Sequence, residues 1–224
     1  MVILAKKGNK RVDRGGTEPP STTRLIACGA FRAAVETLKL KERYLDVRVT
    51  FLPSNLHVWP DKLKRYLSRE VRKAQRNNER IICLYGECFP GIDEFCERRG
   101  IIRTPGLYCY EMLLGSEQFH GIIDETAGTY FLERELIVNF DEYCVEPLEL
   151  YDEDMRKSYF QHYRRLLYVR QPSDSDLVPR ARELAQFLNL SLEIRDVDYL
   201  YFEEKLTSLI EGKHPRGNSP MGGT

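Results

Sequence analysis

Short apolar runs alternate with amphipathic stretches along most of the chain, and this alternation restricts the fold more than any other feature of the sequence. The apolar runs predict strands at residues 24–30, 47–52, 80–85, 128–132, 166–169 and 192–197. Patterns with helical spacing lie between them, at 31–44, 61–77, 92–99, 152–163, 178–188 and 200–210. Strands separated by helices are typical of βαβ units. We therefore predict an α/β fold, a three-layer sandwich with a mainly parallel sheet in a single domain.

The ends of the chain differ from its middle. Residues 1–21 are rich in Gly, Lys, Arg and Pro and show no apolar period, and residues 211–224 have a similar composition. We predict two disordered tails around one α/β domain at 22–210. Within the domain, residues 61–77 form a strongly charged helix that is expected to bury Leu63, Tyr66, Leu67 and Val71.

Charge and cysteine content narrow the classes of function. Lys plus Arg equals Asp plus Glu, at 34 each, so the chain has no net positive charge that would attract nucleic acid or an anionic membrane. No stretch approaches the ~20 apolar residues that cross a bilayer. The N-terminus places its apolar residues before its cations, the reverse of a secretory signal, so a cytoplasmic location is expected. Six cysteines in such a chain favour ligation or redox chemistry over disulfides.

Three of the cysteines follow predicted strands or open a predicted helix. Cys28 ends the first strand, Cys88 lies just past the third, and Cys109 opens a helix near Tyr110. Ligands of open parallel sheets collect beyond the carboxyl ends of the strands, so these thiols are expected at one rim. Cysteine at a helix N-terminus is expected to have a lowered pKa. Cys83, Cys96 and Cys144 fit ordinary buried positions.

His57 takes the equivalent place after the second strand. Three thiolates and one imidazole make a suitable tetrahedral set for zinc, and three cysteines alone are able to hold an iron–sulfur cluster. Cys28, Cys88, Cys109 and His57 are thus the predicted metal ligands. The spacing itself is no metal signature, because the chain has no C-x-x-C pair, and free buried cysteines are common.

Two acidic residues lie beside the cysteines. Glu87 precedes Cys88, and Glu111 lies two residues after Cys109, so either is placed to orient a ligand or move a proton. They are the predicted catalytic residues, although isolated acids of this kind more often face solvent or cap helices. Phosphate-loop, nucleophile-elbow and dinucleotide-binding motifs are absent from the sequence.

At these same residues the sequence resembles an uncharacterised family, catalogued as domain of unknown function 1638. The resemblance runs from about residue 24 to 210 and is carried by RLIACGA, LHVWPDKL, YGECFPG, PGLYCYEM, AGTYFLERELIVNFD and YFQHYRRLLYV. It implies that Cys28, His57, Glu87, Cys88, Cys109 and Glu111 match recurring polar positions of that family. It also implies an association with corrinoid-dependent methyl transfer and related one-carbon metabolism.

Three functions remain open from the sequence. The first is a metal-binding protein with a zinc or iron–sulfur site, acting on a small-molecule substrate or a corrinoid protein. The second is a metal-free transferase in which Cys109 attacks an electrophile with His57 or Glu111 as the base. The third is a non-catalytic accessory protein of a corrinoid methyltransferase system, without an essential cysteine. Neither nucleic acid nor a membrane is expected as a partner.

Overall fold

The computed structural model describes residues 22–213 and confirms the α/β class with parallel strands. The strands are β1 (Thr23–Cys28), β2 (Val47–Leu52), β3 (Arg80–Leu84), β4 (Ile102–Arg103), β5 (Thr129–Leu132), β6 (Arg165–Arg170) and β7 (Ser191–Asp196). They form two sheets rather than one: β2-β1-β3-β4 and β5-β6-β7, each with parallel pairing throughout. The predicted tails lie outside the described residues, apart from a turn at 211–213.

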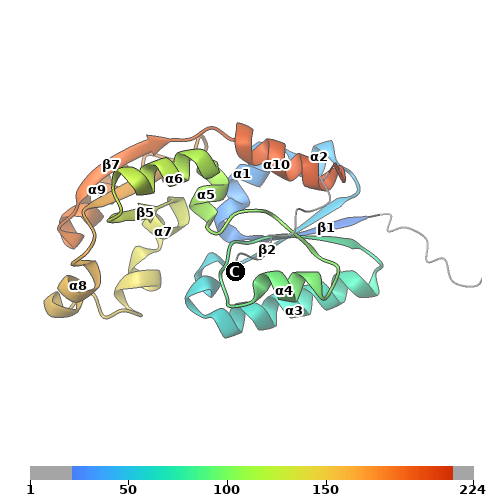
Figure 1. The fold of residues 1–224 in the computed structure, drawn as a ribbon, viewed down its shortest axis with the longest axis horizontal. Coiled ribbons are helices and arrows are strands. Elements are labelled where there is room, and N and C mark those ends of the chain that lie inside the picture. The colour runs from blue at the N-terminus through green and yellow to red at the C-terminus, as the bar shows by residue number, and fades with distance from the viewer. Residues whose placement is uncertain (1–21, 214–224) are drawn as a thin grey trace, which may run out of the picture.

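Helices connect the strands as the alternation predicted. They are α1 (Arg32–Thr37), α2 (Leu40–Arg43), α3 (Pro60–Arg76), α4 (Ile92–Glu97), α5 (Cys109–Leu114), α6 (Ser116–Glu125), α7 (Arg134–Val138), α8 (Glu153–Phe160), α9 (Val178–Leu188) and α10 (Leu200–Ile210). Short helical turns η1 (Gly29–Phe31), η2 (Ser54–Val58) and η3 (Asp141–Val145) complete the chain order. In Figure 1, α3 and α4 cover the lower side of the first sheet, and α1, α2 and α10 lie on its upper side.

The first helix differs from the expected continuous span over 31–44. It is divided into η1, α1 and α2, and the break between α1 and α2 falls at Lys39, which adopts a left-handed conformation with φ 51°. A non-glycine residue rarely takes this conformation, so the sequence gives no sign of the break. In α3, Leu63, Leu67 and Val71 are buried as predicted, but Tyr66 is 40% exposed. Tyr66 lies under the guanidinium group of Arg69 instead, with 4.8 Å between the guanidinium carbon and the ring centre.

Two apolar cores hold the sheets. The first surrounds β1 and β3, where Leu25, Ile26 and Ile82 are fully buried, as is usual for parallel strands covered on both faces. The second lies under α7 and α9 and includes Leu166 and Tyr168 of β6. The alternate residues of β6, Leu167 and Val169, point the other way and join the first core. The second sheet therefore contributes to both cores.

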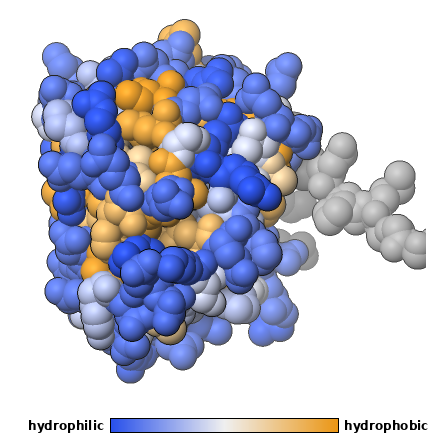
Figure 2. Space-filling model, turned by 90° about the vertical axis from the view of Figure 1, so that its left-hand side faces the viewer, coloured by the Kyte–Doolittle hydropathy of each residue, from blue (hydrophilic) through white to orange (hydrophobic). Residues whose placement is uncertain are grey.

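Figure 2 views the molecule from the side of the second sheet and shows apolar side chains gathered across the middle of this face, bordered by hydrophilic ones. Leu192 and Ile194 of β7 are only partly buried and pack against the second core. Among residues 22–213, no helix has the length and apolar character needed to cross a membrane.

Candidate functional site

A cavity of about 320 Å³ lies at the carboxyl ends of β1, β3 and β5. Ligands of parallel sheets collect beyond the carboxyl ends of the strands, and this strand-end rule predicted three cysteines at one rim. The lining of the cavity includes all three, Cys28, Cys88 and Cys109, together with His57 and Glu87. The remaining lining residues are mostly apolar or aromatic: Ala30, Phe31, Ser54, Gly86, Leu107, Tyr108, Tyr110, Glu133, Leu136 and Tyr143. Residues more than a hundred positions apart in the sequence thus meet in one cavity.

Glycine at two positions brings the loops of the cavity together. A Cβ on Gly86 would lie 2.3 Å from the carbonyl oxygen of Leu107, so only glycine lets the Leu107 loop approach the end of β3. This approach is fixed by the amide of Glu87, which donates to the same Leu107 oxygen at 2.8 Å. A Cβ on Gly29 would meet the amide of Ser54 at 3.2 Å. The two glycines therefore allow the loops that carry Cys109 and His57 to close on the strand ends.

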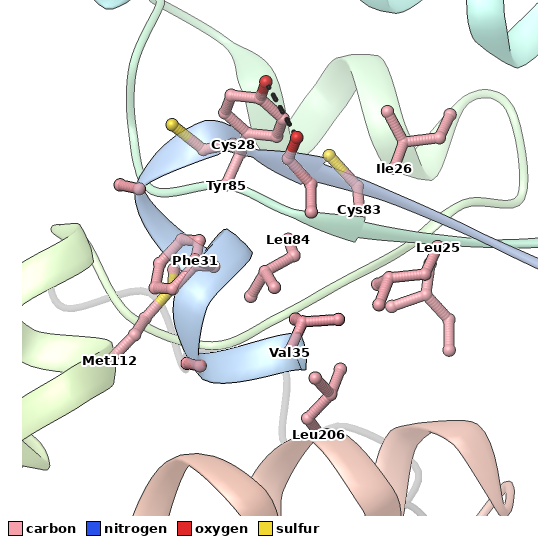
Figure 3. Packing of buried hydrophobic residues seen from close by; sticks show 14 of the residues in the cluster. Leu25, Ile26, Cys28, Phe31, Val35, Cys83, Leu84, Tyr85, Met112 and Leu206 are labelled. Carbon is pink, nitrogen blue, oxygen red and sulfur yellow. Dashed lines mark hydrogen bonds between the residues drawn. The ribbon is translucent and has the colours of Figure 1, made fainter. Parts of the chain in front are cut away.

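The Cys28 thiol is held at the end of β1. Its side chain is 7% exposed, and burial raises its pKa to about 12, with a smaller opposing effect from the amide of Ala30. Figure 3 shows Cys28 beside Tyr85, whose hydroxyl donates to the carbonyl of Ala27 at 3.4 Å, while Cys83 lies farther back along β3. The thiol thus stands at the rim of the sheet rather than in its interior.

The other two thiols are also protonated in this environment. Burial raises the pKa of Cys88, although a hydrogen bond from the backbone amide of Gly86 and the cation of Arg103 act in the opposite direction. Burial raises the pKa of Cys109 well above its usual value, and the carboxylate of Glu133 and the thiols of Cys28 and Cys88 add to this effect. The three sulfur groups therefore lie close enough to influence one another electrostatically.

The lowered pKa expected for Cys109 is wrong. Cys109 is the first residue of α5, and the amide of Tyr110 does favour its thiolate. However, α5 has only six residues, and the cost of burying a charge there, together with the nearby Glu133, Cys28 and Cys88, outweighs the attraction of the helix end.

His57 stands at the rim of the cavity in η2. Its Nδ1 lies 2.6 Å from the carbonyl oxygen of Ser54, and the surrounding protein lowers its pKa although the side chain as a whole is exposed. The ring is therefore neutral at physiological pH. Ser54 also contacts Tyr143, whose hydroxyl lies 3.3 Å from Ser54 Oγ, so the loop after β2 touches the segment after α7.

The two acids predicted as catalytic residues take different positions. Glu87 is exposed and lines the cavity. Glu111 is buried at 7% exposure and is not among the residues that line it. Its carboxylate accepts hydrogen bonds from the amide of Leu107 at 2.8 Å and from Ser116 Oγ at 2.9 Å. Glu111 therefore fixes the loop that precedes Cys109.

Glu133 is a site residue that the sequence reasoning missed. It follows β5 directly, is 4% exposed, and accepts hydrogen bonds from the amides of Glu135 and Leu136 at the start of α7. Burial raises its pKa to about 8 despite these two bonds. The strand-end rule that selected the cysteines also applies to Glu133, but the separate second sheet was not foreseen.

The donor types in the cavity suit a soft metal, because thiolate and imidazole groups bind zinc and iron–sulfur clusters. Within residues 22–213, however, no three His, Cys, Asp or Glu side chains already stand in a metal-binding arrangement. Binding therefore requires some of these side chains to turn toward a common point, for example by changing between staggered χ1 rotamers.

Comparison with curated proteins and with solved structures gave no match. A family model described as a protein of unknown function, DUF1638, matches residues 51–206, more than half of the chain. The matched region contains His57, Cys88, Cys109 and Glu133, while Cys28 lies before it. The chain belongs to this family of proteins of unknown function, DUF1638.

Proposed function

We propose that the cavity binds a soft metal centre, zinc or an iron–sulfur cluster, through the thiolates of Cys28, Cys88 and Cys109. The observation that carries the proposal is the presence of these three thiols, from the end of β1, the loop after β3 and the start of α5, on one cavity of about 320 Å³. His57 is the fourth ligand of a zinc site, or the rim group of a cluster with one open iron. A bound metal with an open position would supply a Lewis acid that activates a substrate thiol or accepts a methyl group.

The cavity residues have separate roles in this proposal. Cys28, Cys88 and Cys109 bind the metal, and the apolar side chains of Phe31 and Leu136 keep bulk water from it. Glu87 at the rim is available to move a proton of a substrate. The resemblance to the family favours corrinoid-linked one-carbon or methyl-transfer metabolism as the setting, with a small molecule or a corrinoid protein as the partner.

The metal-free transferase is the weaker alternative. A nucleophilic cysteine normally needs a lowered pKa or an adjacent base. Here burial raises the pKa of Cys28, Cys88 and Cys109, and no Lys or Arg lines the cavity to offset this effect. Arg103, which lies outside the lining, opposes it only in part at Cys88. A metal ion would provide that positive charge and stabilise the thiolates.

The test is metal analysis after anaerobic purification. The wild type and the variants Cys28→Ser, Cys88→Ser and Cys109→Ser are compared with Cys144→Ser, a control at a buried cysteine of the second core. We expect the metal in the wild type and in the control and its loss from the three site variants. A brown protein with iron and sulfide indicates a cluster, and a colourless protein with zinc indicates a single ion. A wild type without metal, or three variants that retain it, would contradict the proposal.

A further inference from the structure

A stripe of cations runs along the exposed side of α3. Its members recur every three or four residues, the spacing of one helix face, and all are exposed: Lys62, Arg65, Arg69, Arg72 and Arg76. At 1.5 Å per residue the stripe is ~21 Å long. Among the described residues, Lys62, Arg65, Arg72 and Arg76 make no ion pair, and the ion pair of Arg69 is with Glu70.

Carboxylates gather in a second segment, between residues 141 and 154. All seven of its acids are exposed and no Lys or Arg interrupts them: Asp141, Glu142, Glu146, Glu149, Asp152, Glu153 and Asp154. Within the part of the chain that the structure describes, Asp141 pairs with Arg180 and Glu153 with Lys157, while the other five make no ion pair. The formal net charge of the chain is zero, and these two patches carry charges of opposite sign.

The segments that carry the two patches touch beside the candidate site. Asn55, in the turn that leads into α3, donates to Glu142 at 3.2 Å, and Ser54 contacts Tyr143. Ser54 and Tyr143 both line the cavity, which therefore lies beside the contact between the two segments. In Figure 1, helix α3, which carries the stripe, and the segment before α8 lie along the same lower side of the molecule. The lower part of the end face is covered mostly by hydrophilic side chains (Figure 2).

We infer that a second copy of this chain docks on this side, with the α3 stripe of each copy against the acidic 141–154 segment of the other. Adjacent patches of opposite sign become self-complementary when a two-fold axis passes between them, because each copy then offers the charge that the other lacks. Arginine suits this contact, since its planar guanidinium group pairs with carboxylates through two parallel hydrogen bonds. The dimer brings the mouths of the two cavities close to the interface.

The test combines charge reversal with mixing. One variant carries Lys62→Glu, Arg65→Glu and Arg72→Glu, which leaves three acids against Arg69 and Arg76 on the stripe and makes both patches acidic. The other carries Glu146→Lys, Glu149→Lys, Glu153→Lys and Asp154→Lys, which leaves four lysines against three acids in the segment and makes both patches basic. Sedimentation velocity in 50 mM and 500 mM salt measures the mass of each variant and of their equimolar mixture. Lys41→Glu with Lys213→Glu, on α2 and after α10, is the control for charge reversal elsewhere on the surface, and circular dichroism checks that every variant keeps its fold.

We expect the wild type and the control to dimerise at low salt and to dissociate at high salt, with Kd raised about tenfold or more because exposed charges are screened. Each single-patch variant is a monomer, and the mixture regains the dimer, since the acidic stripe of one variant faces the basic segment of the other. A wild type that stays monomeric, a mixture that does not associate, or species that grow beyond the dimer would overturn the two-fold arrangement. Binding of polyanions such as a DNA duplex without dimer formation would also overturn it.

Discussion

Nδ1 of His57 lies 2.6 Å from the carbonyl oxygen of Ser54. A carbonyl oxygen only accepts hydrogen bonds, so Nδ1 carries the proton of the neutral ring and Nε2 keeps its lone pair. This is the arrangement found in metal-binding histidines, whose second nitrogen donates to a carbonyl or carboxylate group. The contact therefore prepares His57 for a role at the rim of the cavity.

His57→Gln is predicted to weaken zinc binding by at least about tenfold, because it removes the free ring nitrogen. The measurement is competition for zinc with a chromophoric chelator. His120→Gln is the matched control, since Nδ1 of His120 makes the same kind of contact, 2.7 Å from the carbonyl of Ser116, but on the exposed side of α6. Equal zinc affinity in the His57 variant and the wild type would show that His57 takes no part in binding.

Gly86→Ala is predicted to destabilise the protein by about 1–3 kcal/mol, because the new methyl group would overlap the backbone at Leu107 and push the Cys109 loop outward. Urea denaturation measures this free energy, and zinc affinity is expected to fall with it. Gly121→Ala in α6 is the control, since its Cβ meets nothing within 4 Å. Alanine there is expected to be neutral or to stabilise the helix by about 0.5–1 kcal/mol. An equally stable Gly86→Ala protein would contradict the account of this loop.

Glu111→Ala is predicted to cost about 1–3 kcal/mol of stability, because it leaves the amide of Leu107 without its buried acceptor. Zinc affinity is expected to fall as well, since the loop before Cys109 loses its support. The exposed Glu117→Ala in the first turn of α6 serves as the control and should change stability by less than about 0.5 kcal/mol. Loss of metal binding without any loss of stability would instead indicate direct contact between Glu111 and the metal.

The positions of the strands could be predicted from the sequence, but their division into two sheets could not. Apolar periodicity identifies a strand and its faces, whereas pairing depends on which edges meet in space. The alternate faces of β6 illustrate the difference, because Leu166 and Leu167 belong to different cores. The short strand β4 was also missed, since two residues give no periodic signal.

The strand-end rule selected four residues of the cavity lining, namely Cys28, His57, Cys88 and Cys109. It did not lead to Glu133, because the cavity also includes the end of a strand from the second sheet. Nor did the sequence reveal the protonation of Cys109, since proximity to a helix N-terminus is visible in the sequence and burial depth is not. Metal binding itself stays a prediction.

Removal of the metal is predicted to lower the stability of the wild type. A ligand that binds only the folded state adds about 2.7 kcal/mol to the free energy of unfolding when its free concentration is about 100 times Kd. Thermal unfolding before and after treatment with a strong chelator measures the difference. A variant that combines Cys28→Ser, Cys88→Ser and Cys109→Ser is expected to unfold at the same temperature in both conditions, and a chelator effect of equal size in that variant would place the metal elsewhere.

The most direct test of the central claim is cobalt substitution. Co²⁺ added to metal-free protein under anaerobic conditions is predicted to give intense sulfur-to-cobalt charge-transfer absorption that saturates at about one equivalent, as expected for a thiolate-rich tetrahedral site. The band should weaken with each of Cys28→Ser, Cys88→Ser and Cys109→Ser and stay unchanged in Cys144→Ser. Wild-type protein that binds Co²⁺ without this band, or that shows no binding, would contradict a three-thiolate metal site.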